Sequence, residues 1–321
     1  MTDTTTNSTS ISTASTSAKM PTQLLGADGP PVSRIALGCM GLTGTWNPAE
    51  MNETHVHRAV AAFEAAMDAG ITFYDHADIY GGGTCEDVFK DCLRAVPGSR
   101  DKIVIATKCG ILHGHYNLSY AYIQEAIDRS LKRLGVEYID LYQLHRPDPF
   151  THASETARAL NELVRQGKVR TVGVSNYYPE QVRALQRYLD MPIRSNQFQV
   201  SLRHLPPIYD DGTLDQCEAL QITPLAYSPL GGGVLSGKHE PGEDKILTGL
   251  LAELKTQSEA YNATPAQVAI AWLLAHPAQI VPLVGSANPA HIYEFAGAIN
   301  VNLSREDWYK LWVAGRGERV P

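Results

Sequence analysis

The chain has 321 residues, of which 44% are hydrophobic and 19% charged, a balance typical of a globular protein with a substantial core. Its net charge of −7 argues against nucleic acid as a partner, because phosphate binding needs a basic face. No run approaches the roughly 20 apolar residues of a membrane span, so no membrane partner is expected. The five cysteines are scattered and include no C-x-x-C pair. This usage suits a reducing compartment such as the cytoplasm and disfavours a disulfide framework or a zinc cage.

Residues 1–20 differ in composition from the rest of the chain. More than half of them are Ser or Thr, and almost none offers a side chain to bury. Such a segment cannot offset the entropy lost on ordering it, so it predicts a disordered tail before a single domain over residues 21–321. A targeting peptide is the alternative, but the segment lacks both Arg and an apolar stretch.

Beyond the tail, short β-rich runs alternate with amphipathic helical runs. The predicted strands are a hairpin, 22–25 with 32–34, and then eight runs at 35–37, 71–75, 103–107, 138–144, 169–174, 195–200, 223–227 and 280–284. Helices are predicted after these eight strands, at 56–67, 86–96, 119–134, 157–164, 180–188, 214–220, 250–275 with a break near 264–265, and 289–298. Ser304 can cap a further C-terminal helix.

Strands that alternate with helices pair in parallel, because each helical crossover returns the chain to the same end of the sheet. Eight such units close most simply into a barrel. A doubly wound open sheet would be expected to carry G-x-G-x-x-G after its first strand, and none stands there; the glycine triplets at 81–83 and 231–233 fit neither that motif nor a P-loop. The sequence therefore predicts an α/β fold, a (β/α)8 TIM barrel with an N-terminal β-hairpin and extra C-terminal helices.

Titratable side chains gather at the carboxyl ends of three consecutive predicted strands. Asp75 ends the second strand with Tyr80 five residues on, Lys108 ends the third, and His145 ends the fourth. Each alone is weak evidence, since a strand-end Asp is usually a turn residue and a lone Tyr or His is usually packing. All these strand ends open onto one face of a parallel barrel, where the chemistry of such folds gathers. Their coincidence predicts an active site.

Together these groups suit the reduction of a carbonyl, in which hydride addition leaves an alkoxide that must be protonated. A free Tyr has a pKa of about 10, and a cationic Lys108 beside Tyr80 is expected to lower that pKa. Asp75 would hold the ammonium in place. His145 would orient the substrate oxygen and assist the proton transfer.

The stretch G-I-T-F-Y-D-H-A-D-I-Y-G at 70–81, with Glu86 following, resembles the first signature of the aldo-keto reductases. Lys108, and His145 in L-Y-Q-L-H-R, match the remaining members of that family's Asp–Tyr–Lys–His tetrad, and residues 167–176 are similar to its fifth-strand signature. The resemblance runs from about residue 37 to about residue 298. It is closest to the branch of bacterial-type oxidoreductases that carry D-H-A-D-I-Y.

The resemblance implies an NAD(P)H-dependent reductase of aldehydes or ketones, with Tyr80 as general acid and no metal. It assigns the nicotinamide carboxamide to Ser175, Asn176 and Gln197, and the stacking on the ring to Tyr227. It assigns the rest of the cofactor to Ser228, Leu230, Gly231, Gly233 and Lys238 over the pyrophosphate and to Gly285, Ser286, His291 and Glu294 at the adenosine end. Glycine lets backbone amides approach phosphate closely, and a helix opening at Gly285–Ser286 would favour an anion on dipole grounds.

One departure from the family concerns the 2′-phosphate of NADP, which relatives commonly clamp with Lys or Arg. Here Ala287 and Asn288 stand near the helix start, His291 takes the usual Arg position, and Phe295 stands where Asn is frequent. NADPH is still the expected cofactor, and the missing cationic clamp makes NADH possible as well.

Two other classes of function are alternatives. A cofactor-binding regulatory subunit, like the channel-associated β-subunits of the same fold, would also keep the tetrad. A metal-dependent hydrolase or isomerase would need a carboxylate–histidine ligand set that the strand ends lack, and the pairs His55/His57 and His113/His115 bring no third ligand. Trp46 and residues 113–116 are expected to shape the pocket of a small carbonyl substrate. Cys109 is expected to be inert packing.

Overall fold

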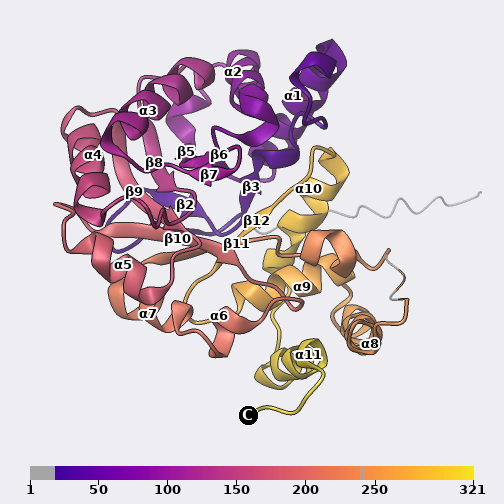
Figure 1. Cartoon of the computed structure of the whole chain (residues 1–321). Coiled ribbons are helices and arrows are strands. Elements are labelled where there is room, and N and C mark those ends of the chain that lie inside the picture. Colours follow the sequence, from indigo (N-terminus) through magenta and orange to yellow (C-terminus); the bar gives the residue numbers. More distant parts are fainter. Residues whose placement is uncertain (1–18, 239, 241) are drawn as a thin grey trace, which may run out of the picture.

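The computed structural model describes residues 19–238, 240 and 242–321, and shows a closed barrel of eight parallel strands ringed by helices (Figure 1). In order around the barrel the strands are β3 (Ala36–Gly38), β4 (Phe73–Asp75), β5 (Val104–Cys109), β8 (Ile139–Leu144), β9 (Val169–Ser175), β10 (Ile193–Gln199), β11 (Thr223–Tyr227) and β12 (Val281–Val284). β12 pairs with β3 to close the ring. The predicted (β/α)8 barrel is confirmed.

The predicted N-terminal hairpin is also present, as β1 (Thr22–Leu24) paired antiparallel with β2 (Pro31–Ser33). Leu25 and Val32 are fully buried and cluster with inward-facing side chains of the barrel strands, such as Phe73 and Leu141. The hairpin therefore closes one end of the barrel with apolar side chains, which leaves the opposite end for function.

Helices follow the barrel strands as the sequence pattern predicts. They are α1 (Glu53–Asp68), α2 (Thr84–Ala95), α3 (Tyr120–Leu134), α4 (Ala153–Arg165), α5 (Pro179–Gln186), α6 (Pro206–Tyr209), α7 (Thr213–Leu220), α8 (Lys245–Tyr261), α9 (Pro265–Leu274), α10 (Pro289–Ala296) and α11 (Arg305–Arg316). Ser119 caps α3, and Thr264 forms a capping box at the start of α9. Ser304 caps the extra helix α11, which packs beside α8 (Figure 1). In the described part of the chain, no helix is long and apolar enough to span a membrane.

The structure departs from the sequence prediction in three places. The loop after β5 contains a small hairpin, β6 (Ile111–Leu112) with β7 (His115–Tyr116), and the short helix α6 precedes α7; neither was predicted. Met20, assigned to the tail, is buried against Gly70, so the packed part of the chain begins earlier than predicted. The rest of the predicted tail, residues 1–18, lies outside the described residues.

Candidate active site

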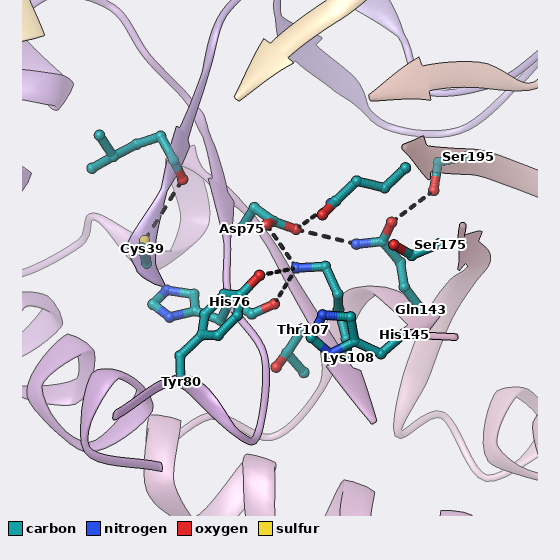
Figure 2. A network of polar contacts seen from close by, with 12 residues as sticks. Cys39, Asp75, His76, Tyr80, Thr107, Lys108, Gln143, His145, Ser175 and Ser195 are labelled. Carbon is teal, nitrogen blue, oxygen red and sulfur yellow. Dashed lines mark hydrogen bonds and ion pairs between the residues drawn. The ribbon is translucent and has the colours of Figure 1, made fainter. Parts of the chain in front are cut away.

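The four side chains predicted to act together do converge at one face of the barrel (Figure 2). Asp75 is the last residue of β4, Lys108 lies near the end of β5, and His145 directly follows β8. Tyr80 stands on a short 3-10 turn (Tyr80–Gly83) between β4 and α2. Because the strands are parallel, their carboxyl ends bring these residues together from positions up to 70 apart in the chain.

Lys108 is the centre of the arrangement. Its side chain is fully buried, and its ammonium donates hydrogen bonds to Asp75 Oδ2 at 2.7 Å, to the His76 carbonyl at 2.8 Å and to the Tyr80 hydroxyl at 3.1 Å. A buried ammonium is stable only when paired and hydrogen-bonded, and all three of its protons have an acceptor here. The geometry aims a cation at the phenol oxygen.

The electrostatics of this group differ from the sequence prediction in one respect. Burial by itself would lower the pKa of Lys108, but the adjacent Asp75 carboxylate and Tyr80 raise it above the ordinary value, so the ammonium stays charged. For Tyr80, burial raises the pKa, and the opposing effect of Lys108 does not fully offset it. The expectation of a net lowered pKa for Tyr80 was wrong for the protein alone, because desolvation outweighs the nearby cation.

His145 faces Tyr80 across the mouth of the barrel, with the two ring centroids 5.9 Å apart in an edge-to-face arrangement. Burial, together with the positive charges of Lys108 and Arg146, lowers the pKa of His145 to about 2. The imidazole is therefore neutral at any ordinary working pH. It can orient a substrate oxygen by hydrogen bonding, but as a neutral ring it is not the source of the proton.

Two glutamine amides complete the shell around Asp75, and the sequence prediction missed the first of them. Gln143 on β8 donates to Asp75 Oδ1 at 3.2 Å, and its own amide oxygen accepts from the Ser195 hydroxyl at 3.4 Å (Figure 2). Gln197 on β10 donates to the same Asp75 oxygen at 2.8 Å. The period-two alternation of β8 places Gln143 inside the barrel, and a buried polar residue there was the available signal.

A cleft of about 620 Å³ extends from Tyr80 and His145 toward α10. All of the residues assigned to the cofactor line it, except Gly231 and Ser286. Its volume is in the range of small-molecule and cofactor sites. The predicted cofactor residues are therefore arranged along one continuous cleft that begins at the predicted catalytic residues.

The end of this cleft assigned to the nicotinamide contains strained backbone. Asn176 and Ser228 adopt left-handed conformations, with φ values of 59° and 52°, although neither is glycine. The Asn176 side chain donates to the His145 carbonyl at 3.2 Å and accepts a hydrogen bond from the Tyr227 hydroxyl at 3.0 Å. Strain of this kind persists only where surrounding contacts hold it, and it gathers at ligand sites.

The loop after β11 supplies open backbone to the cleft. The 3-10 turn Gly231–Ser236 contains Gly232 and Gly233 at φ 74° and 96°, and no atom lies within 4 Å of where a Cβ would stand on either. Open glycine backbone of this kind lets amide groups approach a phosphate closely.

At the end of the cleft assigned to the adenosine, the helix predicted at 289–298 is present, but Gly285 and Ser286 do not open it. α10 starts at Pro289 and is capped by the Asn288 side chain, which accepts from the Ala290 amide, so Gly285 and Ser286 precede the helix. A proline fits the first helical position because its missing N–H needs no partner there. The Ser286 hydroxyl accepts from the Asn288 amide at 3.1 Å and lies 3.4 Å from His291 Nδ1. Ser286 and His291 are thus adjacent, as the prediction of a shared anion site requires.

The remaining sequence predictions fall around this cleft. The Trp46 ring is 58% exposed and stands edge-on to Tyr80 with centroids 6.5 Å apart, so it borders the approach to the phenol. Cys109 is buried, and burial raises the pKa of its thiol, in agreement with inert packing. A second cavity of about 660 Å³ lies beside α11, where Trp308 and Trp312 line it, and none of the four catalytic candidates borders it.

Comparison with known proteins independently supports the resemblance to the aldo-keto reductases. The sequence model described as the Aldo/keto reductase family matches residues 34–312. The chain is 42% identical over 304 residues to a 6-dehydroglucose reductase of Novosphingobium aromaticivorans, covering 92% of this chain and 96% of that protein. It is 31% identical to the aldo-keto reductase yakc [NADP(+)] of Schizosaccharomyces pombe, covering 89% of this chain and 88% of that protein.

Among solved structures, the fold is similar to the thermostable aldo-keto reductase Tm1743 in complex with the inhibitor epalrestat. The TM-score is 0.80 at 28% identity, over 92% of this chain and all of that one. These relatives reduce the case for a regulatory subunit, which none of the comparisons supports. The chain belongs to the aldo-keto reductase family, and its activity is the reduction of a carbonyl group.

Proposed function

We propose that this chain is an NADPH-dependent reductase that converts the aldehyde of a sugar related to 6-dehydroglucose into the alcohol, with Tyr80 as the proton donor. The observation that carries the proposal is the contact of the Lys108 ammonium with both Asp75 and the Tyr80 hydroxyl, at the deep end of the long cleft. Aldo-keto reductases use nicotinamide cofactors, and the cleft offers the amides, the open glycine backbone and the polar end that such a cofactor needs.

When bound, the reduced nicotinamide supplies a hydride to the carbonyl carbon. Ser175, Asn176 and Gln197 would hold its carboxamide, Tyr227 would stack on the ring, and the 228–238 loop would cover the pyrophosphate. Gln197 donates to Asp75 in the protein alone, and its proposed contact with the carboxamide requires a changed or shared hydrogen bond. Ser286, His291 and Glu294 would surround the adenosine end.

Tyr80 then protonates the substrate oxygen as negative charge develops on it. Lys108 stabilises the phenolate that remains, because the ammonium is within hydrogen-bond distance and partly offsets the effect of burial on the Tyr80 pKa. Asp75 fixes the ammonium, and neutral His145 orients the substrate oxygen toward the phenol. General acid catalysis of this kind contributes roughly 10²–10⁴-fold to the rate.

Two observations support the choice of cofactor. A relative carries NADP(+) in its name, and Ser286 lies beside His291, which lines the cleft. An imidazole and a hydroxyl form weaker contacts to a 2′-phosphate than an Arg fork does, so NADH is expected as a poorer but usable alternative. Five buried, free cysteines suit the reducing cytoplasm, where NADPH is available.

The substrate class rests on the relatives named for 6-dehydroglucose, of which one is 42% identical over almost the whole chain. The approach to Tyr80 is bordered by an exposed aromatic ring, Trp46, and by the basic side chain of Arg146. An aromatic face and a hydrogen-bond donor together suit a polyhydroxylated small molecule.

The experiment is a steady-state comparison of 6-dehydroglucose with simple aldehydes and ketones, each with NADPH and NADH, followed by loss of nicotinamide absorbance. We expect the highest kcat/KM with the sugar aldehyde and NADPH. Equal or greater kcat/KM for simple aliphatic aldehydes would contradict the substrate class, and equal kcat/KM with NADH would contradict the cofactor.

A further inference from the structure

The segment that carries Tyr80 is anchored from outside the active site by a cluster of Asp78, Glu86 and Arg133, of which Glu86 is fully buried. Tyr80 is followed by three glycines, Gly81, Gly82 and Gly83, with φ values of 58°, 66° and 101°. These residues provide no side chains that could pack and fix the direction of the phenol, and left-handed glycine is the least restrained part of a backbone. Besides the contacts of its own side chain with Lys108 and His145, the position of Tyr80 therefore depends on contacts made on either side of it in the chain.

The contacts on the N-terminal side involve the peptide of Asp78. Its N–H donates to the Lys108 carbonyl at 3.0 Å, and its C=O accepts from the guanidinium of Arg133 on α3 at 3.1 Å. On the C-terminal side the same guanidinium lies against Gly83, so closely that a Cβ there would collide with it. It also forms a 3.6 Å ion pair with Glu86, a fully buried carboxylate in the first turn of α2.

We propose that Arg133 is a positioning residue for the proton donor: its guanidinium fixes both ends of the segment 78–83 and so holds the Tyr80 hydroxyl against Lys108. A fork of donors suits this task, because one planar group can meet a carbonyl, a carboxylate and a flat glycine peptide at once. The helices that carry Arg133 and Glu86, α3 and α2, pack side by side (Figure 1). The inference rests on the proposed role of Tyr80.

The charges around the cluster are consistent with this role. Burial and the neighbouring Glu86 raise the pKa of Asp78 to about 7, while Tyr122, Arg129 and Arg133 on α3 oppose that rise. Glu86 accepts from the Thr107 hydroxyl at 2.7 Å, and burial raises its pKa as well. Arg133 is therefore held by the Glu86 carboxyl group and by the Asp78 backbone carbonyl.

The test uses Arg133→Met and Arg133→Lys, with Arg129→Met as the matched control. Arg129 lies one turn earlier on α3, is 43% exposed and pairs with Glu125, so its loss removes the same charge without releasing the segment. We expect kcat of the full-length enzyme to fall about 10- to 100-fold in Arg133→Met, because small misplacement of a reacting group has effects of that size. NADPH affinity is expected to stay within about twofold, and the isotope effect with deuterated NADPH is expected to rise as chemistry becomes limiting. The control should keep wild-type kcat.

Arg133→Lys keeps one donor and should recover part of the lost rate. Because Arg133→Met leaves Glu86 unpaired and could destabilise the fold, the double variant Arg133→Met/Glu86→Gln is measured as well; we expect it to regain thermal stability but not kcat. A folded variant with near wild-type kcat per cofactor-binding site and an unchanged isotope effect would overturn the proposal. If Tyr80→Phe itself retains turnover, the proposed role of Tyr80 fails instead, so the two failures are distinguishable.

Discussion

The two ends of the long cleft are built differently. At the Tyr80 end, Lys108 is fully buried with three acceptors, and Asp75 takes hydrogen bonds from three side chains. At the α10 end, Ser286 and His291 are only partly buried, their mutual contact is 3.4 Å, and Gly285 is exposed. The comparison indicates that the side chains around Tyr80 are held by several contacts within the protein, whereas the residues at the α10 end are held by fewer.

The largest effect is expected from Lys108→Met, which removes the buried cation at the Tyr80 end of the cleft. Removing the ammonium leaves Asp75 buried and without its cation, which destabilises a fold by about 3–5 kcal/mol, and turnover should fall about 10²–10⁴-fold. Urea denaturation and steady-state kinetics measure the two effects. The double variant Lys108→Met/Asp75→Leu should recover stability without activity; recovery of both would show that the pair is only structural.

A smaller effect at the same end is expected from Gln143→Met. This change removes one hydrogen bond to the Asp75 carboxylate and leaves the Ser195 hydroxyl without its acceptor, while Lys108 and Gln197 still hold Asp75. We expect a loss of about 1.5–3 kcal/mol of stability, the usual value of a hydrogen bond to a charged group. Turnover should fall far less than in the lysine variant. A loss of activity as large as that of Lys108→Met would contradict the view that the contacts to Asp75 are redundant.

At the α10 end of the cleft, a substitution is expected to strengthen cofactor binding rather than weaken it. His291→Arg places a forked cation beside Ser286, and we expect NADPH to bind about 1–2 kcal/mol more tightly with NADH nearly unchanged. Fluorescence titration of both cofactors measures this, with Ala290→Arg as a control that adds the same charge one residue away on α10. Equal tightening of NADPH and NADH would place His291 away from the 2′-phosphate.

The smallest effect is expected for Asp78, which lies in the segment that carries Tyr80. Burial raises its folded-state pKa to about 7, well above the ordinary value of an Asp, so its contribution to stability is present in acid and is lost as pH rises through about 7. Asp78→Asn removes this titration, and the melting temperature of the variant should fall less than that of the natural protein between about pH 5 and pH 8. An identical pH dependence in both proteins would show that Asp78 does not carry the titration.

The sequence predicted the barrel well because its signals are local and repeated. The alternation of strands and helices, the caps Ser119 and Ser304, and the break at Thr264 are each readable from a few neighbouring residues. The convergence of Asp75, Tyr80, Lys108 and His145 followed from strand polarity alone.

The features that could not be predicted from the sequence depend on burial and on contacts between residues far apart in the chain. The shift of the Tyr80 pKa was predicted in the wrong direction, because burial of the phenol raises the pKa more than the nearby ammonium lowers it. Burial cannot be read from residue spacing. The contact between Gln143 and Asp75 joins residues 68 apart, and the cluster of Asp78, Glu86 and Arg133 joins three separate elements. The helix predicted at 289–298 is confirmed by α10, but Gly285 and Ser286 were expected to open it, whereas Asn288 is the residue that caps it.

The most direct test of the whole account is a single-turnover measurement on Tyr80→Phe. The variant is loaded with NADPH, mixed with excess aldehyde, and followed by loss of nicotinamide absorbance, while quenching of protein fluorescence reports cofactor binding. The account predicts NADPH affinity within about twofold of the natural protein and a hydride-transfer rate reduced about 10²-fold or more, because the phenol proton is needed only as charge develops on the oxygen. Retention of more than about a tenth of the natural rate would contradict the assignment of Tyr80 as the proton donor.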